Sequence, residues 1–307
     1  MSNKIKKIGV LTSGGDAPGM NAAIRSVVRT CAHHNIECVG VYRGYEGLME
    51  GDFKEMNARS VKDIINKGGT ILKSARSKEF RTKAGRKKAY ESLKAAHVDA
   101  LVSIGGDGTF TGAMIFNQEF NFPVIGIPGT IDNDIFGTSH TIGYDTALNT
   151  VIGAIDKIRD TAISHNRLFF VEVMGRDAGH IALNTGIGAG AEEILIPEEN
   201  VGLERLLESL SRSEKSGKSS SIVVIAEGDK TGKNVDRFNS RIIFPVKFSP
   251  LKKAVLSGTT IASKFVKDAS FLSFPSNILD NTSDSVVLIS DCNCVIFVND
   301  ATRGNPL

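Results

Sequence analysis

The chain has 307 residues, 41% of them hydrophobic and 23% charged, which is typical of a globular protein with one large or two moderate domains. Its 37 basic and 34 acidic residues leave a net charge of only +3, too little for a protein whose main partner is nucleic acid. No apolar run reaches membrane-spanning length, and four cysteines are too few for a disulfide scaffold. We therefore expect a cytoplasmic protein that binds neither nucleic acid nor membranes.

The first part of the chain alternates apolar runs with glycine-rich loops. Apolar residues at helical spacing follow the first loop, and amphipathic stretches follow the second strand. The pattern predicts strands over 8–11, 38–42, 98–104 and 123–127, a helix over 20–31, amphipathic stretches around 61–67 and 86–97, and loops over 12–16, 105–109 and 128–134.

A second series of elements begins after Tyr144. It predicts a helix along 148–158, strands over 168–173, near 194–196 and over 222–226, and a helix from about 203. Strands that alternate with helices indicate an α/β fold, here two doubly wound domains with mostly parallel sheets. We assign residues 1–142 and 143–235 to these domains and 236–307 to an atypical tail. Such sheets bind ligands beyond the carboxyl ends of their strands.

Two of the glycine-rich loops are suited to phosphate groups. Gly14-Gly15-Asp16, at the mouth of the first helix, offers backbone N–H groups, although tight turns need glycine for geometry alone. In the second loop, Gly105–Thr109, the single carboxylate of Asp107 is placed to meet Mg²⁺ carried by a nucleotide. The alternative is that Asp107 only caps the following helix.

The third loop, Pro128–Asp134, places two carboxylates near the hydroxyl of Thr130. Phosphoryl transfer to an alcohol needs one carboxylate that takes the hydroxyl proton and another that helps with the metal. The same Asp-Asn-Asp sequence is also common in simple turns.

Arginines complete the candidate site, because they bind phosphate bidentately. Arg76, Arg167 and Arg176 lie in or beside the predicted loops. Arg25 and Arg29 lie four residues apart on the polar side of the first helix, which suits either a solvated face or a second, regulatory phosphate site.

These loops, together with Met174-Gly-Arg176, resemble those of the bacterial ATP-dependent 6-phosphofructokinases through about residue 235. The resemblance implies that MgATP and fructose 6-phosphate meet between two α/β domains, where the sugar's 1-hydroxyl attacks the γ-phosphorus in line. It implies Asp132 as general base, Asp107 as the Mg²⁺ ligand, and Arg176 with Gly15 as stabilisers of the transferring group. Thr130 and Asp134 then help to orient phosphate, hydroxyl and metal-bound water.

The resemblance also implies the remaining binding positions and an oligomer, a homotetramer, because Arg167 resembles an arginine that reaches the sugar phosphate of a neighbouring subunit. ATP would contact Gly15, Tyr45, Arg76, Gly105, Gly106, Asp107, Gly108 and Thr109. Fructose 6-phosphate would contact Thr130, Asp132, Asp134, Met174, Gly175, Arg176 and Glu227. A regulatory site for ADP and phosphoenolpyruvate would comprise Arg25, Arg29, Arg59, Arg159 and Glu192.

Two glycines indicate which phosphoryl donor the chain uses. Pyrophosphate-using relatives are expected to have an aspartate, which obstructs the α-phosphate of ATP, and a lysine, which holds pyrophosphate. This chain has Gly108 and Gly129 at those positions, which favours ATP. Another kinase with a Gly-Gly-Asp-Gly loop, acting on a lipid or on NAD, is an alternative that the loops at 128–134 and 174–176 oppose.

The resemblance stops after Val235. The family's His-x-x-Arg-Gly-Gly segment, which clamps the sugar 6-phosphate, is absent, and residues 236–307 contain no His, Glu or Gln. To explain this change of sequence, we hypothesise that the tail is an out-of-frame or otherwise altered reading of the gene's end. The alternative is a divergent natural terminus, with strands around 285–290 and 295–298. The tail favours one alternative function, a catalytically impaired nucleotide-binding protein. A pyrophosphate-dependent enzyme is a separate alternative.

Overall fold

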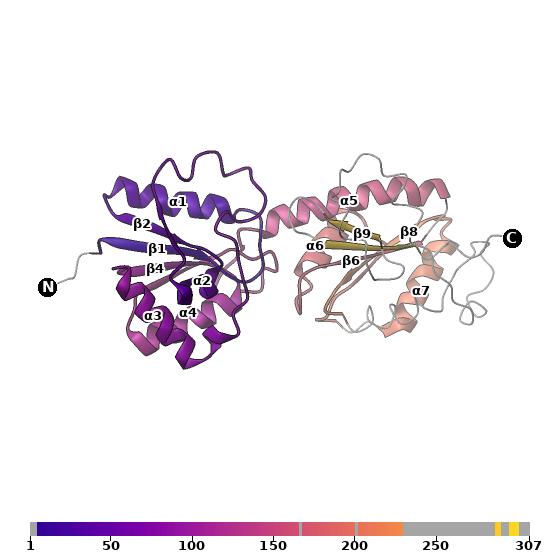
Figure 1. Cartoon of the computed structure of the whole chain (residues 1–307). Coiled ribbons are helices and arrows are strands. Elements are labelled where there is room, and N and C mark those ends of the chain that lie inside the picture. The colour runs from indigo at the N-terminus through magenta and orange to yellow at the C-terminus, as the bar shows by residue number, and fades with distance from the viewer. Residues whose placement is uncertain (1–4, 166–167, 200–201, 230–285, 290–294, 301–307) are drawn as a thin grey trace. The chain divides into compact units, whose positions relative to one another are not determined.

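The computed structural model describes residues 5–165, 168–199, 202–229, 286–289 and 295–300 (Figure 1). The chain divides into two compact units, the first ending at Thr146 and the second beginning at Ala147. Each unit contains one sheet of five strands. The units are described separately below.

The sheet of the first unit is mostly parallel and has the strand order β3-β2-β1-β4-β5. Four strands run in parallel, and β3 pairs antiparallel with β2 at one edge. The strands are β1 (Lys7–Thr12), β2 (Glu37–Val41), β3 (Phe53–Met56), β4 (Ala100–Gly105) and β5 (Val124–Pro128). Strand order reverses direction between β1 and β4, and sheets of this kind bind ligands beside that point.

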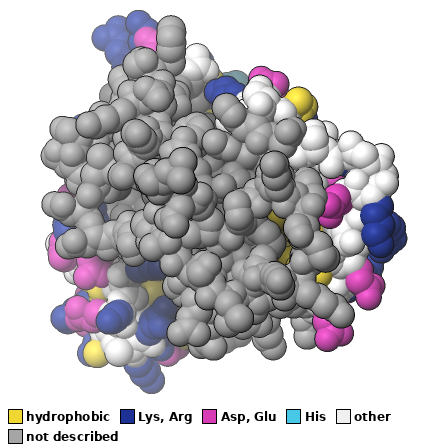
Figure 2. All heavy atoms as spheres, turned by 90° about the vertical axis from the view of Figure 1, so that its right-hand side faces the viewer, with side chains coloured by type: hydrophobic (Ala, Val, Ile, Leu, Met, Phe, Trp, Pro, Cys, Tyr) yellow, Lys and Arg dark blue, Asp and Glu magenta, His cyan; other side chains and the backbone are white. Residues whose placement is uncertain are grey.

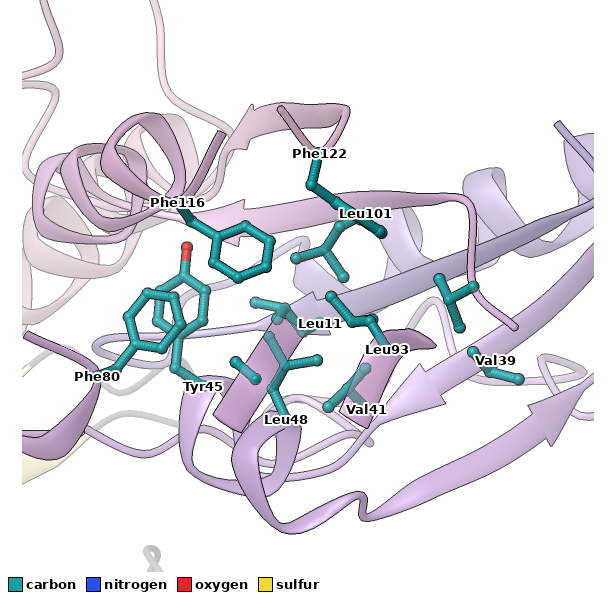
Figure 3. Packing of buried hydrophobic residues seen from close by; sticks show 12 residues of the cluster. Leu11, Val39, Val41, Tyr45, Leu48, Phe80, Leu93, Leu101, Phe116 and Phe122 are labelled. Carbon is teal, nitrogen blue, oxygen red and sulfur yellow. The ribbon is translucent and has the colours of Figure 1, made fainter. Parts of the chain in front are cut away.

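Helices cover both faces of this sheet, with α1 on one side and α3 and α4 on the other (Figure 1). The helical elements are α1 (Met20–His33), α2 (Gly44–Glu50), η1 (Glu79–Arg81), α3 (Lys83–Ala95) and α4 (Asp107–Phe120). Beneath α3 and α4, side chains from strands and helices interdigitate in one apolar cluster that includes Leu11, Leu48, Leu93 and Phe116 (Figure 3). This core fixes the strand ends that carry the candidate loops.

The second unit has a mixed sheet of order β7-β8-β6-β10-β9. Strands β6, β7 and β8 are parallel, whereas β10 pairs antiparallel with both β6 and β9. Its elements are α5 (Tyr144–His165), β6 (Leu168–Val173), α6 (His180–Gly188), β7 (Glu193–Leu195), α7 (Gly202–Lys215), β8 (Ser221–Ala226), β9 (Val286–Ile289) and β10 (Val295–Asp300). Leu195, Leu206 and Val223 form part of its core.

The α/β fold is confirmed, with a mostly parallel sheet in the first unit and a mixed sheet in the second, and strands do lie near 285–290 and 295–298. The remainder of the 236–307 tail lies outside the described residues. Of the two amphipathic stretches, the one around 86–97 lies in α3, whereas the one around 61–67 forms turns that bury Val61 and Ile64. Gly68 and Gly69 follow it, and glycine disfavours helix continuation.

The described surface carries charges of both signs. Figure 2 shows basic and acidic side chains interspersed where described residues reach the surface in that view. Within the described part of the chain, none of the helices combines the length and apolar character needed to cross a bilayer.

Candidate functional site

Three predicted loops of the first unit meet at the carboxyl ends of β1, β4 and β5. The backbone N–H of Ser13 donates to Ile104 O at 3.0 Å, and the N–H of Gly129 donates to Gly105 O at 3.0 Å. The buried hydroxyl of Thr109 donates to Ser13 O at 3.1 Å. Hydrogen bonds therefore fasten the loop after β4 to the loops on both sides of it.

Asp107 is the first residue of α4 and is exposed. The helix is capped by Gly106, which has no side chain, so the alternative that Asp107 is the N-cap is wrong. A carboxylate in the first turn of a helix is stabilised by the helix dipole. Open space lies in front of Gly15 and Gly108, since a Cβ built on either would meet nothing within 4 Å beyond its chain neighbours and, for Gly108, the backbone of its own helix. The loop edge is accessible at both glycines.

The first loop differs from the expectation that its glycines lie at the mouth of a helix. Helix α1 begins only at Met20, after Gly19, and Gly14 adopts a positive φ of 89° that favours glycine. The carboxylate of Asp16 accepts a hydrogen bond from Thr70 N at 2.9 Å. The Gly14-Gly15 turn therefore offers backbone N–H groups without the support of the α1 dipole.

Tyr45 lies beneath the Gly105–Thr109 loop. Its side chain is only 5% exposed, and its ring stacks on Phe80 with centroids 3.9 Å apart (Figure 3). Its hydroxyl donates to Thr109 O at 2.7 Å, and burial raises its pKa. Tyr45 thus supports the loop from below, whereas Arg76 is exposed.

In the third loop, Asp132 is buried, with 7% of its surface exposed. Its backbone N–H donates to Thr130 Oγ1 at 3.2 Å. Asn133 adopts a positive φ of 55°, and its side-chain oxygen accepts from Thr141 N at 2.8 Å. The segment does turn, and the turn leaves Asp134 exposed while it holds Asp132 inside.

The second unit brings Glu227, at the end of β8, to the loop that follows β6. One carboxylate oxygen of Glu227 accepts from Gly175 N at 3.3 Å and from Arg176 N at 2.5 Å. Arg176 is exposed and has a φ of 56°, rare for a residue with a side chain. Met174 is half-buried beside them, and Arg167 lies outside the described residues.

The residues expected to bind effectors belong to both units. Arg29 and Arg59 are exposed on the first unit, and half-buried Arg25 donates to Val61 O at 2.6 Å. In the second unit, Arg159 donates to the carbonyl oxygens of Ala189 and Gly190, beyond the end of α6.

Glu192 is the second expected effector residue of that unit, and its side chain is 6% exposed. It accepts from Ile222 N at 2.6 Å and pairs with Lys218 at 3.1 Å. Lys218 is a cation that sequence reasoning did not single out. No motif marks it, and only the fold brings it to Glu192.

The described residues hold no cluster of three or more His, Cys, Asp or Glu side chains that would bind a metal ion by themselves. Asp107 is therefore a single carboxylate. This suits Mg²⁺, which is commonly held by one or two carboxylates together with the phosphates of a nucleotide.

Comparisons with known proteins point to one family. A family model described as Phosphofructokinase matches residues 7–274. The chain is 58% identical to ATP-dependent 6-phosphofructokinase 2 of Bacteroides thetaiotaomicron and 57% identical to ATP-dependent 6-phosphofructokinase 1 of Thermus thermophilus. Each match covers 228 residues, which is 74% of this chain and 70% or 71% of the relative.

Solved structures show the same likeness. Phosphofructokinase from Saccharomyces cerevisiae has a TM-score of 0.70 and 41% identity over 73% of this chain, which spans only 34% of the yeast chain. A pyrophosphate-dependent phosphofructokinase from Marinobacter aquaeolei has a TM-score of 0.66 at 23% identity, over 76% of this chain and 64% of that one. The second likeness concerns the fold alone.

Proposed function

Because the chain belongs to the phosphofructokinase family, we propose that it is an ATP-dependent 6-phosphofructokinase. It transfers the γ-phosphoryl group of MgATP to the 1-hydroxyl of fructose 6-phosphate, giving fructose 1,6-bisphosphate and ADP. The observation that carries this proposal is the hydrogen-bonded set of three loops at the ends of β1, β4 and β5. It is supported by 55–58% identity to enzymes of that name.

In the proposed mechanism, Asp132 takes the proton of the sugar hydroxyl. The hydroxyl oxygen forms a bond to the γ-phosphorus, the bond from that phosphorus to the β,γ-bridging oxygen breaks, and ADP leaves. The burial of Asp132 supports this role, since a carboxylate shielded from water has little solvent to compete with the substrate for it. Thr130 and Asp134 orient the reacting groups.

Asp107 is the residue that we assign to Mg²⁺. Mg²⁺ bound with the nucleotide neutralises phosphate charge during transfer. The open space in front of Gly15 and Gly108 supports polyphosphate binding beside Asp107, because a chain of phosphates needs close approach to the backbone. Gly105, Gly106, Thr109 and Arg76 complete the nucleotide side, and Tyr45 contributes from beneath the loop.

Arg176 supplies positive charge to the transferring group in this proposal. Its backbone lies in an unfavourable region, and its N–H and that of Gly175 both donate to Glu227; such strain is common at functional sites. Met174, Gly175 and Glu227 belong to the sugar side, together with Arg167. We also propose the homotetramer, and ADP and phosphoenolpyruvate as effectors at Arg25, Arg29, Arg59, Arg159 and Glu192.

The test is ADP release by the purified chain with MgATP and fructose 6-phosphate, alongside its Asp132→Asn variant. The variant keeps the side-chain shape but cannot accept the proton, so we expect kcat to fall by about 10²–10⁴-fold. MgATP affinity should stay near that of the parent. Equal ADP release by parent and variant preparations, both freed of host phosphofructokinase, would contradict the assignment of Asp132.

A second candidate is a nucleotide-binding protein without turnover. It is favoured by the absence of the His-x-x-Arg-Gly-Gly segment and by the matches to curated relatives, which cover 74% of this chain, whereas the family model extends to residue 274. Thermal stabilisation by MgATP without ADP release would favour this candidate. ADP release that depends on Asp132 would exclude it.

A further inference from the structure

Asn21 is a buried polar residue to which the proposed mechanism gives no task. It lies in the first turn of α1 and is 3% exposed. Its amide nitrogen donates to Lys67 O at 2.9 Å and to Gly69 O at 2.7 Å. Its side-chain oxygen accepts from Ile71 N at 2.9 Å. Both amide hydrogens and the oxygen of this side chain therefore bind the backbone of one segment, residues 67–73.

The orientation of the Asn21 amide is determined by these partners. Two carbonyl oxygens face its nitrogen and one N–H faces its oxygen, so the flipped amide would place its oxygen against both carbonyls. An asparagine whose polar atoms are all committed to one segment fixes that segment more tightly than a single hydrogen bond does.

Residues of β1 and the loop after it hold the same segment from the other side. The hydroxyl of Thr12 donates to Lys73 O at 2.9 Å. Because a hydroxyl has one hydrogen, the 2.9 Å contact between the hydroxyls of Thr12 and Thr70 must be donated by Thr70. Asp16 accepts from Thr70 N. These contacts join the segment to the loop that carries Gly15.

Packing alone gives the segment little support. Residues 65–69 are exposed, and only Leu72 is fully buried within the segment. Its conformation therefore depends on polar contacts, of which Asn21 makes three. Arg76, assigned to the nucleotide, follows three residues after Lys73 on the same backbone.

We propose that Asn21 is a positioning residue for nucleotide binding, which fixes segment 67–73 and so the backbone that leads to Arg76. This inference rests on the proposed function. Asn21 does not touch the nucleotide itself. It acts by holding a loosely packed segment against β1, so that the backbone leading to Arg76 does not have to be ordered when the nucleotide binds.

The test is Asn21→Asp in the full chain. The carboxylate keeps an acceptor for Ile71 N but places its second oxygen against Lys67 O and Gly69 O. We expect faster hydrogen exchange at the amides of Thr70 and Ile71 and a rise of at least tenfold in the Kd of MgATP measured by calorimetry. The matched control is Asn117→Asp on α4, where the amide donates to Phe122 O at 2.8 Å. It should leave both measurements unchanged.

Thr12→Val is the second variant, and it decides the question if Asn21→Asp does not fold. It removes the two hydroxyl contacts on the β1 side and should weaken MgATP binding in the same direction. The inference would be overturned if a folded Asn21→Asp or Thr12→Val variant showed faster hydrogen exchange at residues 70–71 and still bound MgATP with the affinity of the parent. Equal weakening by Asn117→Asp would also overturn it. A parent chain that does not bind MgATP would overturn the proposed function itself, and the inference with it.

Discussion

Gly108→Asp tests the placement of the ATP phosphates beside Gly108 without disturbing the packing of the protein. Gly108 is the second residue of α4, and a Cβ built there meets nothing within 4 Å beyond its chain neighbours and the backbone of its own helix. An aspartate at this position therefore fits the folded chain and extends into the open space that we assign to the phosphates of ATP.

The variant should fold at least as stably as the parent. Replacing glycine within a helix contributes a few tenths of a kcal/mol, and an acidic residue near a helix N-terminus contributes about 0.3–1 kcal/mol. Repulsion from the neighbouring Asp107 offsets part of this gain. We expect about 0.5 kcal/mol of added stability, or a rise of about 1–2 °C in Tm for a unit of this size.

MgATP binding should weaken in the same variant. A further negative charge about 4 Å from a phosphate oxygen costs about 1 kcal/mol in water and about 4 kcal/mol at an effective dielectric constant of 20. The Kd of MgATP should therefore rise by about 5- to 1,000-fold. Gly108→Asn is the matched control, because it has the same shape without the charge and should lose less affinity.

The assay is calorimetric titration of MgATP, with Tm measured on the same preparations. Parent-like affinity for MgATP in Gly108→Asp would refute the placement of the phosphates beside Gly108. Gly129 provides a contrast, since a Cβ there would lie 2.9 Å from Ile104 Cγ2 and 3.3 Å from Gly105 N. Gly129→Ala should therefore lower stability by about 1–3 kcal/mol through overpacking.

Two further predictions concern stability. Thr109→Val leaves Ser13 O without its side-chain donor, so the free energy of unfolding measured with denaturant should fall by about 1–3 kcal/mol. Thr111→Val, on the exposed side of α4, should lower it much less. Equal losses in the two variants would contradict this account. The carboxylate of Asp99 accepts hydrogen bonds from the backbone N–H groups of Lys6 and Lys7, and these bonds lower its pKa. The stability that Asp99 contributes is therefore fully present above its unfolded pKa of about 3.9. It is lost as the pH falls through the lower pKa of the folded state. The difference in Tm between parent and Asp99→Asn should shrink below about pH 4, and a difference that stays constant from pH 2 to 6 would count against this.

Strands were the most predictable part of the fold, because β1, β4 and β8 are apolar runs that end at polar or glycine-rich turns. Two helices were missed for a physical reason. α2 contains two glycines within seven residues, and α6 is apolar with little amphipathic character. Neither presents the helical period on which sequence reasoning depends.

Contacts across long sequence separations explain what sequence could not predict at the candidate site. Pairing of β6 with β8 brings Glu227 to Arg176, which lies 51 residues earlier. The position of Tyr45 under the loop depends on its stacking with Phe80. The polar contacts of Asn21 span 46 to 50 residues. The sequence already named Glu227 and Tyr45 as binding positions, whereas the contacts that they make, and the role of Asn21, appear only in the fold.

The antiparallel pairing of β10 with β6 covers an edge of β6 that would otherwise be exposed. β6 carries Leu168–Val173, and β8 satisfies only one of its two edges. Without β10, the other edge would present a row of unpaired backbone groups from a strongly apolar strand, which is a template for association between chains. β10 thus covers this edge of β6 as far as Val173, next to the loop at Met174–Arg176, and leaves no such template there.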